Sequence, residues 1–517
     1  GVPPLCRPEN PLDKTSSPPA TTNRHNEQAI EQEIQQHPHL FLRLAENALT
    51  VAESFRDNYF RNTARLVATL RKGMDAARQG RHDPVLDVRQ VDDTGWPALQ
   101  GEVVTFIDGG VGQVRVSSQV PILLRVGSYT VKTGERRLAE RERFGYYPVI
   151  LGDLEGGSRE RKDFVDIVRI TAELLGGLSI LTRTPDLRVL MFHGPLVYLV
   201  GSYAGHAPFT EADIDLFLRQ YGPHDAAGRA LKEEFLHQAS IDIYPQMASD
   251  RPDELARRRL FEPLAWMAFL YRKLVETAKQ RSPVPIIAGV VERGDLSEFI
   301  ERVLFDRVFR GLRAKGNADY FNQMYGRTDL VSPRAVIERL GYTDALLLGM
   351  LLQPGQRSES WSVAKYDSLH QGNIRLPDEP FETRVTWQVL RPGSPFGFPR
   401  VDACYVAVSE TTEPFRVEVF PDLGADQIDH AATRAYLYAR MLPHYGFPVG
   451  LDVVDHYAHV PAWLTDAYGK LIRYHLGVSL QQGAIQDDEM RRILVQAIYM
   501  THRDWLFRPT QAEGPNG

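Results

Sequence analysis

Three apolar runs in the sequence each stop at a polar side chain. Run 103–107 is followed by Asp108, run 187–192 by His193, and run 284–291 by Glu292 and Arg293. In open α/β sheets, ligands bind outside the carboxyl ends of neighbouring strands, so these side chains would share one cleft if the runs are adjacent strands. A carboxylate in such a cleft is a natural first ligand for a hard divalent cation.

The segment around Asp108 also allows a simpler interpretation. Residues 102–116 are typical of a strand, an Asp108-Gly109-Gly110 turn and a returning strand, because Asp-Gly is a strong hairpin signal. The two glycines allow positive φ, and they let a ligand approach the backbone closely. This stretch alone favours the hairpin turn, with the metal site as the alternative.

A second carboxylate, Glu173, lies on a predicted helix over 163–181. Its helical neighbours Ile170, Leu174 and Leu178 are apolar, so the carboxylate borders a buried face. An unpaired buried charge is strongly destabilising, and Glu173 therefore needs a partner. A metal ion and a salt bridge to Arg169 fit this requirement equally well.

Composition and charge exclude several classes of protein. The net charge is −6, so any contact with nucleic acid must use local basic patches. The only cysteines are Cys6 and Cys404, which cannot form a disulfide framework or a cysteine metal cluster; we expect a cytoplasmic protein. No apolar run reaches the length of a membrane span, so we expect no membrane association.

The chain divides into four expected regions, and the fold class is α/β, with a mixed central sheet flanked by helices. We predict a disordered leader at 1–26, an N-terminal helical region at 27–95, a main domain at 96–480 and a C-terminal helix and tail at 481–517. Helical insertions are expected at about 205–280 and 311–357. The amphipathic N-terminal helix favours docking or dimerisation, or equally packing on its own domain.

The order and spacing of these residues resemble those of the NurA nucleases, which process DNA ends. The resemblance covers about residues 100–475. It begins with Asp108 in FIDGG and Glu173 in RITAELL. His193, in PDLRVLMFHGPLV, stands where the family usually has its second Asp. The later matches are Arg293 in IIAGVVERG, Asp344, Arg357 in PGQRS, Glu418 in PFRVE, the GFP segment at 446–448 and Asp455 after Val454.

The resemblance implies an RNase H-like core and divalent-metal-dependent cleavage of DNA, with Mn²⁺ favoured and Mg²⁺ as the alternative. It implies metal ligation and catalysis by Asp108, Glu173, His193 and Asp455, and a catalytic role for Arg293. It also implies a homodimer that works with a HerA-type hexameric ATPase in DNA processing, repair or anti-phage defence. Supporting roles are expected for Glu418, Arg357 and His456.

His193 is the departure from the family pattern. A neutral imidazole ligates Mn²⁺, but it supplies no negative charge and cannot bridge two metal ions. His193 could instead bond to the neighbouring backbone, and His456 could be a proton shuttle or an ordinary surface histidine.

Two functions follow from this pattern. The first is a metal-dependent deoxyribonuclease acting on DNA ends, and the second is a catalytically weak DNA-binding scaffold subunit of the ATPase complex. A function unrelated to nucleic acid is supported only by the acidic net charge. The sequence has no Walker-type phosphate loop, so nucleotide hydrolysis would come from a partner.

Overall fold

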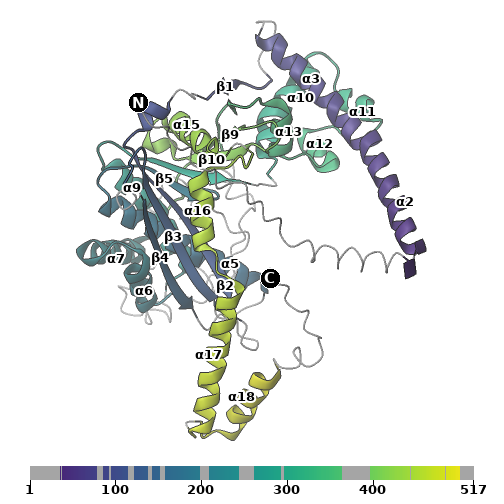
Figure 1. Ribbon diagram of the computed structural model, residues 1–517. Helices are drawn as coiled ribbons and strands as arrows, with labels where there is room; N and C mark the ends of the chain where they lie inside the picture. Colours follow the sequence, from purple (N-terminus) through teal and green to yellow (C-terminus); the bar gives the residue numbers. More distant parts are fainter. Residues whose placement is uncertain are drawn as a thin grey trace, which may run out of the picture. The chain divides into compact units, whose positions relative to one another are not determined.

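The protein is described here from a computed structural model (Figure 1). The structure describes residues 35–36, 38–78, 85–91, 95–114, 122–137, 142–151, 158–197, 209–243, 261–292, 296–363, 396–442, 444–483 and 485–500. The chain forms two compact units, Gly1–Lys72 and Gly73–Gly517. The predicted leader at 1–26, Arg293 and a strand expected at 383–390 lie outside the described residues.

The first unit is helical in its described part. Helix α2 (Pro38–Ser54) continues through one π-helical stretch, η1 (Phe55–Phe60), into α3 (Arg61–Arg78), whose last residues belong to the second unit. Several large apolar side chains of α2 and η1 are exposed, among them Leu42, Leu49 and Phe55. The helical character predicted for this region is present in the residues that the structure describes.

The second unit is built on one mixed sheet of ten strands (Figure 1). In spatial order nine of them run β1-β7-β9-β10-β6-β5-β2-β3-β4, and β8 pairs with β9. Their bounds are β1 (Val88–Gln90), β2 (Val103–Gln113), β3 (Ile122–Lys132), β4 (Glu142–Leu151), β5 (Leu187–His193), β6 (Ile286–Val291), β7 (Gln356–Ser358), β8 (Trp361–Ser362), β9 (Asp402–Val406) and β10 (Phe415–Val419).

The strands β4-β3-β2-β5-β6 form the part of the sheet that contains the three apolar runs. Strands β2, β3 and β4 form an antiparallel meander, whereas β5 and β6 are parallel to β2. Parallel pairing requires crossover connections, and the chain from β2 to β5 crosses over through helix α5 (Ser158–Arg183). The three apolar runs are therefore neighbouring strands, which is the condition that the sequence left open.

Helices cover both faces of this sheet. On one face, α5 contacts β2 and β3, and α9 (Pro263–Lys279) packs against α5. On the other face, α16 (Val449–Ala458) contacts β2, β3 and β5, and α15 (Gln427–Ala439) contacts β6, β9 and β10. Side chains such as Phe106, Met191 and Leu451 fill the core under α15 and α16.

The second unit has further helices and 3-10 turns outside these two layers. They are α6 (Glu211–Tyr221), α7 (Asp225–Asp242), η4 (Ile300–Phe305), α10 (Asp306–Ala314), α11 (Tyr320–Tyr325), α12 (Pro333–Leu340), α13 (Asp344–Leu351), α17 (Ala462–Gln481), α18 (Asp488–Met500) and the 3-10 turns η2 (Trp96–Leu99) and η6 (Pro421–Leu423). Across the described part of the chain, none of the helices combines the length and the apolar character that a membrane span requires.

The expected hairpin at Asp108-Gly109-Gly110 is wrong. Strand β2 runs without a turn from Val103 to Gln113, and Asp108 pairs with Gly127 of β3 in the middle of the strand. The glycines serve close packing instead of a turn. A Cβ on Gly109 would lie 2.4 Å from Oε1 of Glu173 on α5, and a Cβ on Gly110 would lie 1.9 Å from the carbonyl oxygen of Ala458 on α16.

Candidate metal centre

Asp108 is the most buried member of the candidate site. Successive residues of a strand face opposite sides of the sheet. Because Gly109 meets α5 and Gly110 meets α16, the Asp108 side chain lies on the α16 face. Its Oδ1 accepts the Gly109 N–H at 2.8 Å, which fixes one carboxylate oxygen. The other oxygen, Oδ2, is left for a neighbour.

That neighbour is His193, at the end of β5. Ile107 pairs with Phe192 in the parallel register, so the next residues, Asp108 and His193, lie side by side on the same face. Nδ1 of His193 is 3.3 Å from Oδ2 of Asp108. The imidazole packs edge-on against Phe447, with 5.5 Å between ring centroids. The imidazole thus forms a hydrogen bond with a carboxylate, and such a bond fixes the orientation of the ring.

Asp455 reaches the same point from helix α16. The residue is exposed, and the close approach of α16 to Gly110 and Gly127 places it over β2. One ligand atom each from Asp108, His193 and Asp455 lies within 4.8 Å of the others. Two strands and one helix therefore bring two carboxylates and one imidazole to one place, which we call the Asp108 cluster.

The side chains of the Asp108 cluster shift one another's pKa. Asp455 is exposed as a whole residue, but desolvation of its partly covered carboxylate and the neighbouring Asp108 carboxylate raise the pKa of Asp455. Burial lowers the pKa of His193, but the hydrogen bond and the charge of Asp108 outweigh this effect and raise the pKa above its ordinary value. Two carboxylates this close repel each other unless they share a proton or a positive charge lies between them. The donor set of oxygen and nitrogen atoms fits Mn²⁺, and the single nitrogen makes it less suited to Mg²⁺.

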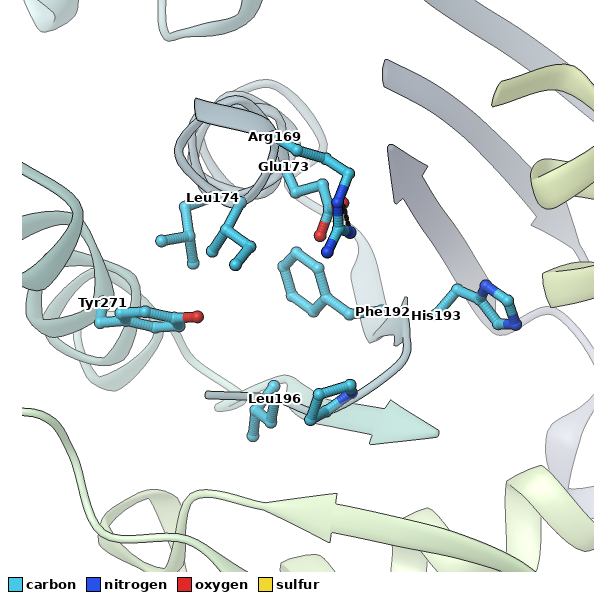
Figure 2. A pocket seen from close by; sticks show the side chains of 9 residues that line it. Arg169, Glu173, Leu174, Phe192, His193, Leu196 and Tyr271 are labelled. Atoms are coloured by element: carbon cyan, nitrogen blue, oxygen red, sulfur yellow. Dashed lines mark hydrogen bonds and ion pairs between the residues drawn. The ribbon is translucent and has the colours of Figure 1, made fainter. Parts of the chain in front are cut away.

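Glu173 has a different environment. Its Oε1 accepts a 2.6 Å hydrogen bond from Nη1 of Arg169, one helical turn earlier on α5. Figure 2 shows these two side chains together, with the His193 ring directed away from them. Burial raises the pKa of Glu173 to about 7, against the lowering effect of Arg169. Of the two partners expected for Glu173, the structure has the salt bridge, and metal ligation by Glu173 stays a prediction.

The expected supporting residues occupy separate places. Glu418 is buried on β10, where it pairs with Arg416 at 2.8 Å and accepts the Leu196 N–H at 2.7 Å. This bond anchors the segment that follows His193. His456 is exposed on α16, next to Asp455.

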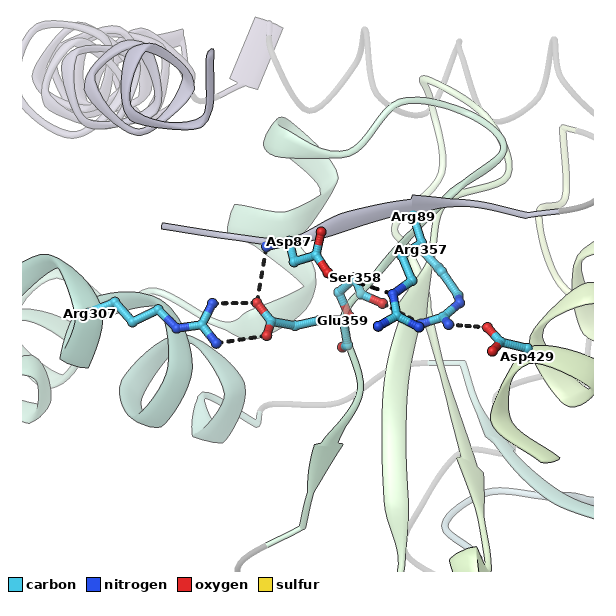
Figure 3. A network of polar contacts seen from close by, with 7 residues as sticks. All are labelled: Asp87, Arg89, Arg307, Arg357, Ser358, Glu359 and Asp429. Atoms are coloured by element: carbon cyan, nitrogen blue, oxygen red, sulfur yellow. Dashed lines mark hydrogen bonds and ion pairs between the residues drawn. The ribbon is translucent and has the colours of Figure 1, made fainter. Parts of the chain in front are cut away.

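Arg357 lies on β7, separated from β5 by three strands of the sheet. It is almost completely buried, pairs with Asp429, and donates to the Ser358 carbonyl oxygen at 2.9 Å (Figure 3). In the same network Arg307 holds Glu359 through two hydrogen bonds of 2.6 and 2.7 Å. The polar contacts of Arg357 therefore tie strands and helices together at the far part of the sheet.

Sequence reasoning missed the second carboxylate beside Arg169. Nη2 of Arg169 is 3.6 Å from Oδ1 of Asp166, so the guanidinium lies between Asp166 and Glu173. The three residues are spaced i, i+3 and i+7, which places them on one face of a helix. That spacing was the available signal for this second group of charges.

Known proteins were compared with the chain. No family model matches it, and none of the curated proteins matches it. Among solved structures, the NurA nuclease from Sulfolobus solfataricus is similar, with 12% identity and a TM-score of 0.40 over 78% of this chain and 92% of that chain. A structure of NurA with manganese has 12% identity and a TM-score of 0.34 over 83% and 96% of the two chains. A structure of NurA bound to dAMP and manganese has 13% identity and a TM-score of 0.25 over 83% and 94%. At TM-scores below 0.5 these likenesses define neither the activity nor the ligands of this chain, which have to follow from its own residues.

Proposed function

We propose that this chain is a metal-dependent deoxyribonuclease of the NurA type that acts at DNA ends. The observation that carries the proposal is the convergence of Asp108, His193 and Asp455 on the central strands of an RNase H-like sheet. The order of site residues along the sequence supports the same function. Glu173 as a ligand and Arg293 as a catalytic residue remain predictions from that order.

The residues of the Asp108 cluster have distinct parts in this function. Asp108 is buried and its Oδ1 is held by the Gly109 N–H, so Oδ2, which faces His193, would be the oxygen offered to a cation. His193 would offer the imidazole nitrogen that is not turned toward Asp108 or, once Asp108 turns to the cation, Nδ1. Asp455 is exposed, so its carboxylate borders the solvent and any bound DNA. A bound divalent cation supplies Lewis-acid stabilisation of a phosphodiester oxygen and lowers the pKa of water.

The proposed partners follow from the resemblance of the site residues to those of the NurA nucleases. We propose DNA as the substrate, a HerA-type hexameric ATPase as the motor and Mn²⁺ as the preferred cation. The exposed apolar side chains of α2 and η1 support a homodimer, since a second copy could cover them. Light scattering should then give about twice the chain mass of 58.5 kDa.

Substitution of Asp108 tests the nuclease function. Asp108→Asn removes a charged ligand and almost no volume, so we expect cleavage of end-labelled linear DNA with Mn²⁺ to be abolished while circular dichroism is unchanged. Asp452→Asn is the matched control, because Asp452 is an exposed carboxylate on the same helix as Asp455 that bonds Tyr445 at 2.8 Å. Cleavage by Asp108→Asn at the wild-type rate would overturn the proposal.

A DNA-binding scaffold is the second candidate function. Two observations favour it: His193 occupies the place of a carboxylate, and Glu173 is already neutralised by Arg169. A scaffold would bind DNA and the ATPase but would cut with neither Mn²⁺ nor Mg²⁺. Gain of cleavage by His193→Asp, from an inactive wild type, would identify the scaffold.

A further inference from the structure

The chain bends over strand β6 directly after His193. His193 pairs with Val290 in the parallel register of β5 and β6, and the Gly194 N–H donates to the Val290 carbonyl oxygen at 2.7 Å. A Cβ on Gly289 would lie 2.8 Å from the Gly194 carbonyl oxygen and 2.6 Å from the Leu196 nitrogen. The backbone of this bend therefore lies against Gly289, and the His193 ring and the Leu196 side chain point away from each other (Figure 2).

A glutamate on the neighbouring strand holds this bend, residues 194–196. Glu418 on β10 pairs with Gly289 in the antiparallel register, so the two residues lie on the same face of the sheet. Oε2 of Glu418 accepts the Leu196 N–H at 2.7 Å, and the Glu418 side chain is only 1% exposed. Because Pro195 has no N–H, this donor is one of only two backbone donors in the bend. A carboxylate accepts a stronger hydrogen bond than a neutral oxygen, so Glu418 is a firm anchor for the bend.

Arg416 holds the Glu418 carboxylate in its place. Nε of Arg416 lies 2.8 Å from Oε1 of Glu418, and both side chains are buried. The two residues alternate along β10 and therefore share one face of the sheet. A buried pair of opposite charges fixes the geometry of both partners, and removal of one partner leaves the other charge uncompensated. One oxygen of Glu418 is thus engaged by the Arg416 charge, and the other by the bend after His193.

We propose that Glu418 is a positioning residue of the metal centre, which keeps the His193 imidazole directed at Asp108 by holding the bend behind it. The inference rests on the metal-dependent function proposed above. His193 is the last residue of β5, and the ends of an element open most easily unless the following residues are held. The His193 side chain is 26% exposed, so a loose bend would let the ring move away from Asp108. Glu418 acts here through the backbone of the bend, without contact to a cation or to DNA.

Binding of Mn²⁺ to the full chain without DNA, measured by isothermal titration, tests this role. Glu418→Ala removes the acceptor of the Leu196 N–H. It should weaken Mn²⁺ binding by about 10–100-fold, which is the usual effect of losing a group that orients a metal ligand. Glu418→Gln retains one acceptor oxygen, which Arg416 and the Leu196 N–H then share. It should bind Mn²⁺ more weakly than wild type and more tightly than Glu418→Ala.

Glu359→Ala is the matched control. Like Glu418, Glu359 joins an arginine to a backbone donor: it holds Arg307 through two hydrogen bonds and accepts the Asp87 N–H at 3.0 Å. It directly follows β7, which three strands of the sheet separate from β5. Glu359→Ala should lower the free energy of unfolding, but it should bind Mn²⁺ as tightly as wild type.

Modification of His193 by diethyl pyrocarbonate, followed by mass spectrometry, reports on the imidazole without any metal. Loss of the anchor should free the ring, so His193 should be modified faster in Glu418→Ala than in wild type. Glu359→Ala should leave the rate of His193 modification unchanged. Circular dichroism establishes that each variant is folded.

Several results would overturn the inference. Wild-type Mn²⁺ affinity in folded Glu418→Ala would do so, as would an equal loss of affinity in Glu359→Ala. Where Glu418→Ala fails to fold, Glu418→Gln decides, and wild-type Mn²⁺ affinity in that variant would overturn the inference. If wild type binds no Mn²⁺, the proposed metal-dependent function fails, and the modification of His193 decides the inference alone. Equal rates of modification in wild type and in the folded Glu418 variants would then refute it.

Discussion

Gly110→Ala tests whether the approach of α16 to β2 builds the metal centre. A Cβ at this position would lie 1.9 Å from the Ala458 carbonyl oxygen and 2.6 Å from its carbonyl carbon. Both atoms are backbone, so no side-chain rotation can relieve the overlap. Restoring an ordinary contact of about 3.4 Å requires the helix and the strand to separate by about 1.5 Å.

The cost of that separation has two parts. Overpacking of a well-packed core typically costs about 1–3 kcal/mol, and we expect Gly110→Ala to lie near the upper end of that range. Asp455 is three residues before Ala458 on α16, so it would move away from Asp108 with the helix. Displacement of a site group by about 1 Å can cost on the order of 100-fold in rate, and we expect a comparable loss of Mn²⁺-dependent cleavage.

The measurement combines urea unfolding, Mn²⁺ titration and DNA cleavage. Gly176→Ala is the matched control, because its Cβ would lie 3.5 Å from Val126, which is an ordinary contact within the α5 face. Alanine also favours a helix over glycine by about 0.5–1 kcal/mol, so this control should be neutral or slightly stabilising. If Gly110→Ala keeps wild-type stability and Mn²⁺ affinity, close packing of α16 on β2 does not position the site.

Three further predictions concern buried and ligating side chains. Asp344→Ala should lower the free energy of unfolding at pH 7, measured by urea denaturation, by about 3–5 kcal/mol. The substitution removes the acceptor of three buried donors: the N–H groups of Phe299 and Ile300 and the Tyr405 hydroxyl. Burial raises the pKa of Asp344 from 3.8 to about 6, so the part of its contribution that depends on protonation is complete below pH 3.8 and is lost as the pH rises through about 6, whereas its role as a hydrogen-bond acceptor remains at pH 7. The difference in unfolding free energy between wild type and Asp344→Asn should therefore shrink across that window, and a constant difference would contradict the shift. His193→Ala should lower Mn²⁺-dependent cleavage by about 10-fold or more. His193→Asp should raise Mg²⁺-dependent cleavage, because Mg²⁺ prefers oxygen ligands. If His193→Ala cleaves DNA as well as wild type with both metals, His193 has a structural role only.

The central strands could be predicted because their signal is local. Each apolar run is about as long as a buried strand, and each is followed by a polar residue. The parallel pairing of β2, β5 and β6 then brings Asp108 and His193 side by side, as expected from neighbouring strands. The positions of Asp108 and His193 could therefore be predicted from the apolar runs and from the rule that ligands bind at the carboxyl ends of neighbouring strands.

The turn at Asp108 could not be excluded from the sequence, because what competes with it is distant in the chain. Asp-Gly-Gly has the local chemistry of a hairpin. In the structure Gly110 and Gly112 instead make room for Ala458 and Val460, which are far along the sequence. Glycine inside a strand also marks close backbone approach, and two glycines spaced by two residues mark one face. The partner that approaches cannot be read from that pattern.

Glycines on β2 explain how one strand serves two groups of charges. Gly110 admits the backbone of α16, which brings Asp455 to Asp108 and His193 on one face. Gly109 admits Glu173 and Arg169 from α5 on the other face, so their charges lie directly behind the Asp108 backbone. Only strand β2 separates the two groups of charges, so their electrostatic interaction is weakly screened. A change of charge on α5 should therefore alter the cation affinity of the Asp108 cluster without altering any of its ligands.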